Sequence, residues 1–251
     1  APMVPEGHVA AMEQWRLPVE RLLPQTERPQ GSLRVERTPQ EVVLSGDGGF
    51  RVAFSTADGE MTVLSRGGEN LIQEGLQANF WRALTDNDVA NGTSERCAVW
   101  ENAGAGAVLR DLQVTESEDG RQATVSALYD MPAQESALKV DYRVTAAGAV
   151  RVTMNFIPGR KPLPEMPVLG MRMVLPAQYD RMTWLGRGPQ ENYPDRKTGA
   201  AVGLYSVGVW EQFHPYVRPQ ETANKTDVRW AALRDTSGRG LLVIGEEPLN
   251  V

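Results

Sequence analysis

Hydrophobic and polar residues alternate with a period of two along most of the chain from about Ser32 onward. The clearest pair of alternating segments, residues 138–144 and 150–156, is separated by the short stretch Ala146-Ala-Gly148. Such alternation places apolar side chains on one face of a strand, and a short break containing glycine closes an antiparallel hairpin. We therefore predict strands over residues 42–45, 50–55, 61–65, 138–144, 150–156, 169–175, 202–206, 229–234 and 241–244.

Helical spacing with capping residues is nearly missing, and the best candidate is a short helix around residues 94–102. Many short strands joined by Gly and Asp turns indicate an all-β fold of the antiparallel sandwich type. By contrast, the glycines and prolines between Trp184 and Arg196 predict a turned, irregular backbone.

The beginning of the chain differs from the rest in composition. Residues 1–18 end in a strand-like run, 9–17, and residues 19–31 are rich in proline, which predicts an extended linker. The sandwich then extends over 32–251. We expect it to be truncated at its end, because the last apolar run, 241–244, is barely complete.

Composition narrows the classes of function. With 251 residues, 41% hydrophobic and 23% charged, the chain is typical of a globular protein of one or two domains. A net charge of −6 argues against nucleic acid or an anionic membrane as partner. No apolar run approaches the roughly 20 residues that span a bilayer. One cysteine, Cys97, and two histidines allow neither a disulfide nor a Cys- or His-rich metal site, so we predict no metal and no cofactor.

The densest group of polar residues lies in the segment 184–196, WLGRGPQENYPDR. Polar side chains gathered on a loop generally fix an interface or line a site. Glu191 stands near Arg187 and Arg196, and neighbouring guanidinium groups lower the pKa of a carboxyl group, which makes it a poor general acid. We therefore predict an ion-paired contact cluster in preference to a catalytic glutamate. Its members are Arg187, Gln190, Glu191, Asn192, Tyr193, Asp195 and Arg196.

Three motifs carry a resemblance to a known family. GPQENYPDR at 188–196 resembles a segment near the C-terminus of the long bacterial beta-galactosidases of glycoside hydrolase family two. FWRALTDND at 80–88 is similar to the FWRAPTDND element of that family, and residues 6–17 are similar to the last strand of the domain that precedes it. The motifs follow one another in the order found in the family.

The resemblance implies both a fold and a role. It implies a large two-sheet supersandwich of the galactose-mutarotase type, with residues 1–18 as a strand remnant of an immunoglobulin-like domain. The whole enzyme would cleave terminal beta-linked galactose with two glutamates held in a separate barrel domain, so this chain alone is expected to be inactive. Its partners would be that barrel, other domains of the polypeptide, and beta-galactosides through the whole enzyme. The seven polar residues would shape the active-site rim, packing or homo-oligomeric assembly. The compartment stays open between bacterial cytoplasm and periplasm.

Two other functions remain open. An independent carbohydrate-binding module would show a stripe of tryptophans on one sheet face, yet the six tryptophans lie in different segments without a shared alternation. A mutarotase-like enzyme would pair a histidine with a glutamate as base and acid, for which His214 and Glu221 are the candidates. The oxygen-rich Thr85–Asp88 tetrapeptide suits calcium, but it lacks the remaining ligand positions of an EF-hand and is expected to cap the following segment.

Overall fold

The computed structural model describes residues 3–5, 7–15, 17 and 31–251, and most of its regular structure is antiparallel β-strand. The strands of the first part are β1 (Leu33–Arg37), β2 (Glu41–Gly46), β3 (Phe50–Ser55), β4 (Met61–Arg66), β5 (Glu69–Asn70), β6 (Glu74–Asn79), β7 (Val108–Glu116), β8 (Gln122–Met131), β9 (Ser136–Thr145), β10 (Val150–Ile157) and β11 (Gly170–Val174). The later strands are β12 (Arg181–Gly188), β13 (Ala201–Gly208), β14 (Val228–Arg234) and β15 (Gly240–Leu249). The predicted all-β class is confirmed.

Helical structure is limited to short pieces. They are α1 (Asp86–Ala90), α2 (Thr93–Arg96) and the 3-10 turns η1 (Ala98–Trp100), η2 (Pro132–Gln134) and η3 (Trp210–Gln212). The helix predicted at 94–102 is therefore a broken one, α2 followed by η1. Among the described residues, these helices are all too short to cross a lipid bilayer.

The chain forms two compact units. The larger unit comprises residues 27–177 and 217–221, and the smaller unit comprises 1–26, 178–216 and 222–251. Residues 19–30, most of the predicted linker, lie outside the described residues. The assignment of 1–18, 19–31 and 32–251 to separate domains stays a prediction.

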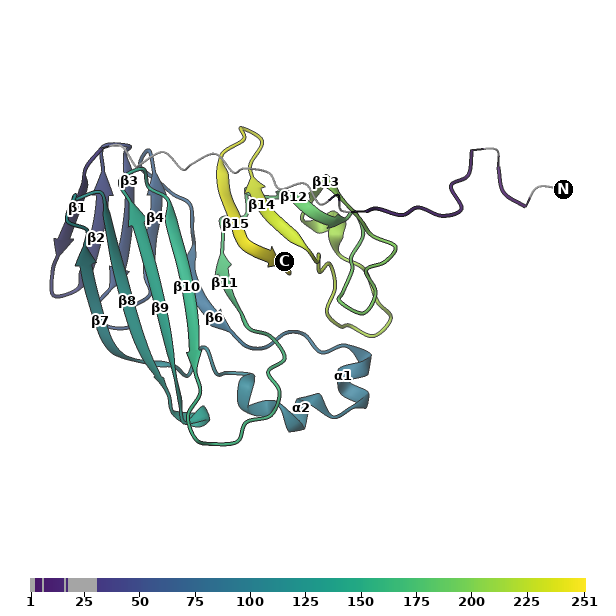
Figure 1. The fold of residues 1–251 in the computed structure, drawn as a ribbon, viewed down its shortest axis with the longest axis horizontal. Helices are drawn as coiled ribbons and strands as arrows, with labels where there is room; N and C mark the ends of the chain where they lie inside the picture. The colour runs from purple at the N-terminus through teal and green to yellow at the C-terminus, as the bar shows by residue number, and fades with distance from the viewer. Residues whose placement is uncertain (1–2, 6, 16, 18–30) are drawn as a thin grey trace. The chain divides into compact units, whose positions relative to one another are not determined.

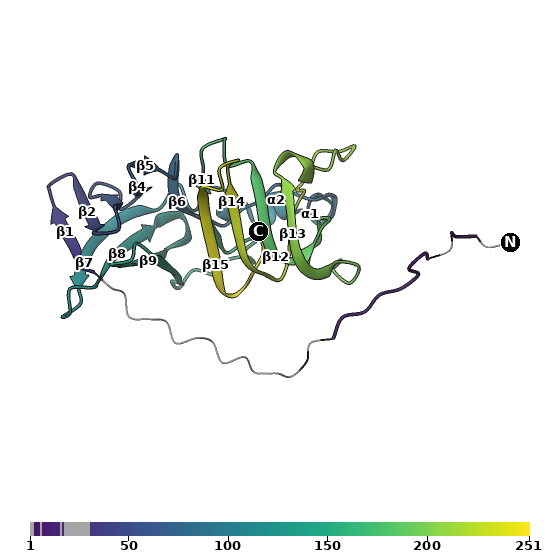
Figure 2. The same cartoon turned by 90° about the horizontal axis from the view of Figure 1, so that it is seen from above.

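The larger unit is a β-sandwich. One sheet has the order β1-β2-β3-β4-β5 and the other the order β10-β9-β8-β7, and every neighbouring pair is antiparallel. Figures 1 and 2 show these two sheets lying face to face. The short pair β11–β6 forms a further two-stranded sheet of this unit.

A single apolar core fills the sandwich. The alternating residues of β9 are buried, and their partners in the opposite sheet include Phe54, whose ring centroid lies 4.8 Å from that of Tyr142. The hairpin predicted from 138–144 and 150–156 has the expected register, with Val144 opposite Val150 and Leu138 opposite Phe156. Burial of alternate residues from both sheets is what the period of two requires.

The smaller unit has one sheet, of order β13-β12-β14-β15, and a much smaller core. The buried residues of this core are Met182, Trp184, Val228 and Ala231, with Tyr205, Val207 and Leu233 packed beside them. Paired residues of neighbouring antiparallel strands point to the same face, so Trp184, Tyr205 and Ala231 share the covered side of the sheet.

The strand-like run predicted at 9–17 carries no strand in its described residues, 9–15 and 17. A strand is stabilised by pairing with a neighbour, and this segment contacts a sheet through one side chain instead. The Gln14 amide donates to the backbone oxygen of Val202 on β13 at 2.9 Å and accepts from the Val202 N–H at 2.6 Å. The Gln14 side chain thus makes the pair of hydrogen bonds that the backbone of a neighbouring strand would make to Val202 at this sheet edge.

Replacing Gln14 with Ala removes both hydrogen bonds to Val202. We expect hydrogen exchange of the Val202 amide to accelerate about fivefold, since one hydrogen bond of this kind contributes about 1 kcal/mol. Gln14→Glu, which keeps the accepting oxygen, should give a smaller increase. An unchanged exchange rate in Gln14→Ala would show that the contact does not persist in solution.

Candidate functional site

The first part of the polar segment is strand, which corrects the prediction of an irregular backbone from Trp184 onward. Residues up to Gly188 belong to β12, paired with both β13 and β14. The glycines serve close packing: a Cβ on Gly186 would lie 2.8 Å from Cγ2 of Val228, and one on Gly188 would lie 2.9 Å from the rings of Trp184 and Tyr205. Glycine in a strand commonly marks such a close approach.

The irregular backbone begins after β12. Residues 189–192 have no regular structure, and Tyr193 and Arg196 form an isolated antiparallel bridge around the exposed turn Pro194-Asp195. The Arg196 N–H donates to the Tyr193 oxygen at 2.9 Å, and the guanidinium carbon of Arg196 lies 4.6 Å from the centre of the Tyr193 ring. This stacking is a cation–π contact, which fixes the turn from both sides.

Glu191 is the centre of the cluster. One carboxylate oxygen accepts from Arg196 at 2.5 Å and from the Tyr216 hydroxyl, and the other accepts from the Thr222 hydroxyl and the Ala223 N–H, both at 3.0 Å. Burial by itself would raise the pKa of Glu191, but these four hydrogen bonds outweigh it and lower the pKa to about 2. The carboxylate is therefore ionised at any physiological pH.

Asn192 is 1% exposed and, like Glu191, joins the loop after β12 to residues 222–226. Its side-chain oxygen accepts from the backbone N–H of Thr226 at 2.9 Å and from the Thr226 hydroxyl at 2.6 Å. Its side-chain nitrogen donates to the Gln190 oxygen at 3.0 Å, and its backbone N–H donates to the Asn224 oxygen at 2.8 Å. A buried amide with all of these partners holds one defined backbone arrangement.

The side chain of Arg187, a residue of β12, contacts two loops, one at Asp227 and the other at residues 197–200. Its Nε donates to a carboxylate oxygen of Asp227 at 2.5 Å, and its Nη1 donates to the backbone oxygens of Lys197 and Ala200. The hydrogen bond from Arg187 holds the pKa of Asp227 below its usual value, and Lys197, whose Nζ lies 3.3 Å from the same carboxylate, adds to this. Arg187 is thus a support for the loop 197–200.

Two of the seven predicted residues are peripheral. Gln190 is exposed, and its side-chain amide donates one long hydrogen bond, 3.4 Å, to the Gly199 oxygen. Asp195 is exposed at the tip of the turn. The structure therefore brings Arg187, Glu191 and Asn192 into a bonded interior, with Gln190 and Asp195 facing solvent.

Several residues of the cluster were not predicted from the sequence. They are Tyr216, Thr222, Lys225, Thr226 and Asp227. Lys225 is the most unexpected, because its side chain is buried; Nζ donates to the Ala223 oxygen at 2.6 Å and lies 5.3 Å from the centre of the Trp184 ring. Burial lowers the pKa of Lys225. The run Asn224-Lys-Thr-Asp227 is a second dense group of polar residues and was the one available signal.

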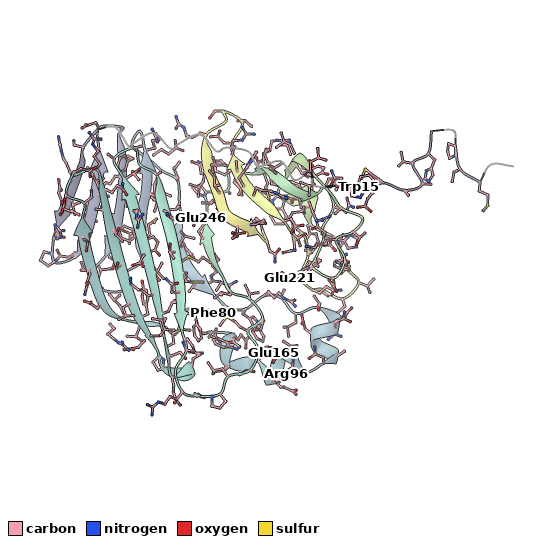
Figure 3. All side chains as sticks on the ribbon, in the orientation of Figure 1. Trp15, Phe80, Arg96, Glu165, Glu221 and Glu246 are labelled. Carbon is pink, nitrogen blue, oxygen red and sulfur yellow. The ribbon has the colours of Figure 1, made fainter. Side chains whose placement is uncertain are left out.

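His214 and Glu221 were the candidate mutarotase pair. The backbone N–H of His214 donates to the Thr222 hydroxyl at 3.0 Å, and the His214 ring packs edge-on against the Tyr216 ring, with ring centroids 4.3 Å apart. Glu221 belongs to the larger unit, where its carboxylate lies 3.0 Å from Nη1 of Arg82. Figure 3 labels Glu221. These contacts give both residues structural partners.

The FWRALTDND element lies in the larger unit. Phe80 is buried in the sandwich core, and Arg82 bridges Asp88 at 2.7 Å and Glu221. Thr85 is the N-cap of α1, and its side chain and that of Asp88 form a reciprocal capping box. Asp88 thus serves the helix, as the prediction of a cap required. No group of three or more metal-ligating side chains occurs among the residues that the structure describes.

The cluster lines neither of the two open grooves found among the described residues. An open groove of about 540 Å³ lies on the larger unit and is lined by residues such as Arg37, Arg110 and Asp111, none of them from the predicted set. The acidic groups of the cluster are Glu191, which pairs with an arginine side chain, and Asp227, which pairs with an arginine and a lysine side chain. Both have lowered pKa values. Such groups accept hydrogen bonds and stabilise structure, whereas a general acid needs a raised pKa.

Comparisons with known proteins agree in one family. Residues 46–250 match the model of the family described as Beta galactosidase small chain. A beta-galactosidase of Priestia megaterium is 35% identical over 95% of this chain and 23% of its own length. One of Lactobacillus delbrueckii subsp. bulgaricus is 35% identical over 84% of the chain and 21% of its own length. One of Halalkalibacterium halodurans is 32% identical over 87% and 22%. The chain spans less than a quarter of the length of these relatives.

Replacing Asn192 with Ala leaves Thr226 and the Gln190 oxygen without their buried partners. We expect a loss of about 3 kcal/mol in the free energy of unfolding, because each orphaned buried polar group costs about 1–3 kcal/mol. Urea denaturation measures it. Gln190→Ala, two residues away and exposed, is the matched control and should change stability by at most about 0.5 kcal/mol. Equal losses in the two variants would contradict the buried role of Asn192.

The lowered pKa of Glu191 predicts a pH dependence. A carboxylate whose folded pKa is about 2, against 4.5 when unperturbed, stabilises the protein above pH 4.5 and loses this contribution as the pH falls toward 2. We expect Glu191→Gln to be less stable by about 2 kcal/mol at pH 7 and to approach the wild type near pH 2.5. Urea denaturation at several pH values tests this. A stability difference independent of pH would show that charge is not the cause.

Proposed function

Because the chain belongs to the beta-galactosidase small chain family, we propose that it is a non-catalytic accessory domain of a beta-galactosidase. In this proposal the whole protein hydrolyses terminal non-reducing beta-D-galactose residues, and its catalytic glutamates lie in a barrel domain elsewhere in the same polypeptide. The support is that three beta-galactosidases match this chain over less than a quarter of their own length.

The observation that carries the non-catalytic role is the bonding of Glu191. Glycoside hydrolysis requires two carboxyl groups facing the scissile bond, one of them acting as an acid. The carboxylate of Glu191 accepts hydrogen bonds from four groups of its own unit, and its pKa is about 2. In such surroundings a proton is not available for transfer to a leaving group at neutral pH.

In this proposal the cluster has an inner and an outer part. Arg187, Glu191 and Asn192 join the loop after β12 to residues 222–227. The outer part, Gln190 and the turn Pro194-Asp195, faces solvent. We expect the inner part to stabilise the loop and the outer part to contact the barrel, where it would contribute to the active-site rim or to the assembly of subunits. No cofactor is required for this role.

The two alternative functions gain little support. For a carbohydrate-binding module, the tryptophans should line one exposed face. Trp100 and Trp184 are buried, Trp81 and Trp230 are partly buried, and the two exposed ones, Trp15 and Trp210, lie on segments far apart in the sequence. For a mutarotase-like enzyme, His214 and Glu221 should act as base and acid, but the His214 ring packs against Tyr216 and the Glu221 carboxylate pairs with Arg82.

The test uses the full-length protein that contains this chain. We expect it to hydrolyse a chromogenic beta-galactoside. Glu191→Ala should lower the unfolding temperature by several degrees or reduce assembly, while kcat per folded molecule stays within about threefold, because a few kcal/mol of lost stability exceed any loss in the chemical step. An unchanged unfolding profile with a large fall in kcat would overturn the proposal.

Two controls complete this test. Glu247→Ala, which removes an exposed carboxylate of β15 outside the cluster, should leave both stability and kcat unchanged. The 251-residue chain by itself should show no turnover and no heat on titration with galactose or lactose. Heat without turnover would favour the carbohydrate-binding module, and turnover would favour an enzyme within this chain.

A further inference from the structure

In the loop that follows β13, apolar side chains are exposed to solvent, whereas polar side chains bond to the protein. Trp210 is 85% exposed and Phe213 is 59% exposed, and Val209 beside them is exposed as well. Most tryptophan side chains in folded proteins are largely covered, and contiguous apolar groups on a surface commonly mark a contact site. Two aromatic side chains within four residues therefore need an explanation.

The polar groups of this loop bond within the smaller unit. The Glu211 carboxylate accepts from the Gly208 N–H at 3.3 Å, and the Gln212 amide lies 3.7 Å from the sulfur of Met182. The His214 N–H donates to Thr222, and the Tyr216 hydroxyl donates to Glu191. These bonds fasten both ends of the loop to the sheet and to the Glu191 cluster.

Fastened in this way, the loop presents its aromatic side chains on a fixed backbone. The N–H of Val209 donates to the Asp180 oxygen at 2.7 Å, and η3 closes with the Phe213 N–H donating to the Trp210 oxygen at 3.3 Å. A preorganised loop loses little conformational entropy when it is covered, and tryptophan is among the residues that contribute most to contact energy. The loop is therefore built for contact.

The chemistry of the loop favours an apolar protein surface over a sugar. A sugar site needs polar groups beside the aromatic ring to bond the hydroxyls. Here Glu211 and Gln212, the polar side chains between Trp210 and Phe213, already contact their own unit. Recognition would then depend on burial of the two rings.

The size of the patch favours a tethered partner. An aromatic side chain buries about 150–250 Å², so Trp210 and Phe213 together offer well under the roughly 800 Å² per partner that a stable free complex requires. A partner on the same polypeptide needs less area, because the tether raises its effective concentration. The relatives of this chain are more than four times its length, which leaves ample polypeptide to supply such a surface.

We propose that the Trp210–Phe213 loop is the point at which the smaller unit docks onto an apolar surface of another domain of the same polypeptide. The proposal rests on the proposed function only in that it requires those further domains. It assigns the contact to this loop, beside the Glu191 cluster, which holds the loop in place through Tyr216.

Hydroxyl-radical footprinting of the full-length protein, read by mass spectrometry, tests the proposal. We expect Trp210 to be oxidised at least about tenfold more slowly than in the unfolded protein, with the buried Trp100 and Trp184 as internal standards. In the double variant Trp210→Ser/Phe213→Ser, apolar side chains outside this chain should gain reactivity and so identify the docking surface. Val108→Ser, which alters an exposed apolar residue of β7, is the matched control and should expose nothing new.

Four outcomes would overturn the docking proposal. They are a Trp210 that reacts as in the unfolded protein, protection that depends on protein concentration and so indicates a second copy, protection that depends on added galactose and so indicates a sugar, and a double variant that exposes nothing outside this chain. A beta-galactoside assay on the same samples separates the two proposals. Protected but inactive protein would contradict the proposed function alone, and active but unprotected protein would contradict the docking alone.

Discussion

The smaller unit depends on the hydrogen bonds that Glu191 and Asn192 make to residues 222–226. Its apolar core is a cluster of four buried residues, and a small core contributes little to stability on its own. The carboxylate and the amide join the loop after β12 to the segment that leads into β14. Without them, two long connections would leave the sheet with their buried polar groups unpaired. The polar network therefore joins the segments of this unit and contributes to its stability, as a larger apolar core does in other domains.

The larger unit shows the contrast. Alternate residues of two facing sheets form one continuous apolar core, in which Phe54, Tyr142, Phe80 and Trp100 are buried. Polar interactions such as the Arg82–Asp88 pair and the capping box of α1 lie at its periphery. Because hydrophobic burial is not directional, such a core tolerates variation in its members. A hydrogen-bonded network has stricter geometry, which suits a segment whose backbone must hold one defined shape.

This division agrees with an accessory role. A network that holds its carboxylates fully bonded at neutral pH is a poor source of protons and a good source of rigidity. The rigidity extends through Tyr216 to the loop that carries Trp210 and Phe213, and through Arg187 to the loop 197–200. What the smaller unit presents to its surroundings is thus a set of fixed loops, with aromatic side chains on one of them and the turn Pro194-Asp195 on another.

Local patterns in the sequence were sufficient for β2, β3, β4, β9, β10, β11, β13, β14 and β15, for the β9–β10 hairpin and for the ion pair of Glu191 with Arg196, because all of these depend on residues close in the chain. They did not indicate β7, β8 or β12. The other partners of Glu191 and Asn192, in the segment from Tyr216 to Thr226, lie 25 to 34 residues away, and local alternation did not indicate which they were. The same limit explains Gly186 and Gly188, whose composition predicted a turn but which lie in the central strand β12, where Gly186 is close to Val228 and Gly188 is close to the rings of Trp184 and Tyr205. Alternation and turn preference are properties of neighbouring residues, so the sequence by itself determined the all-β class. Which polar groups meet, which glycine admits a neighbouring strand and which aromatic ring stays exposed follow from strand order and packing, and only the tertiary structure decided them.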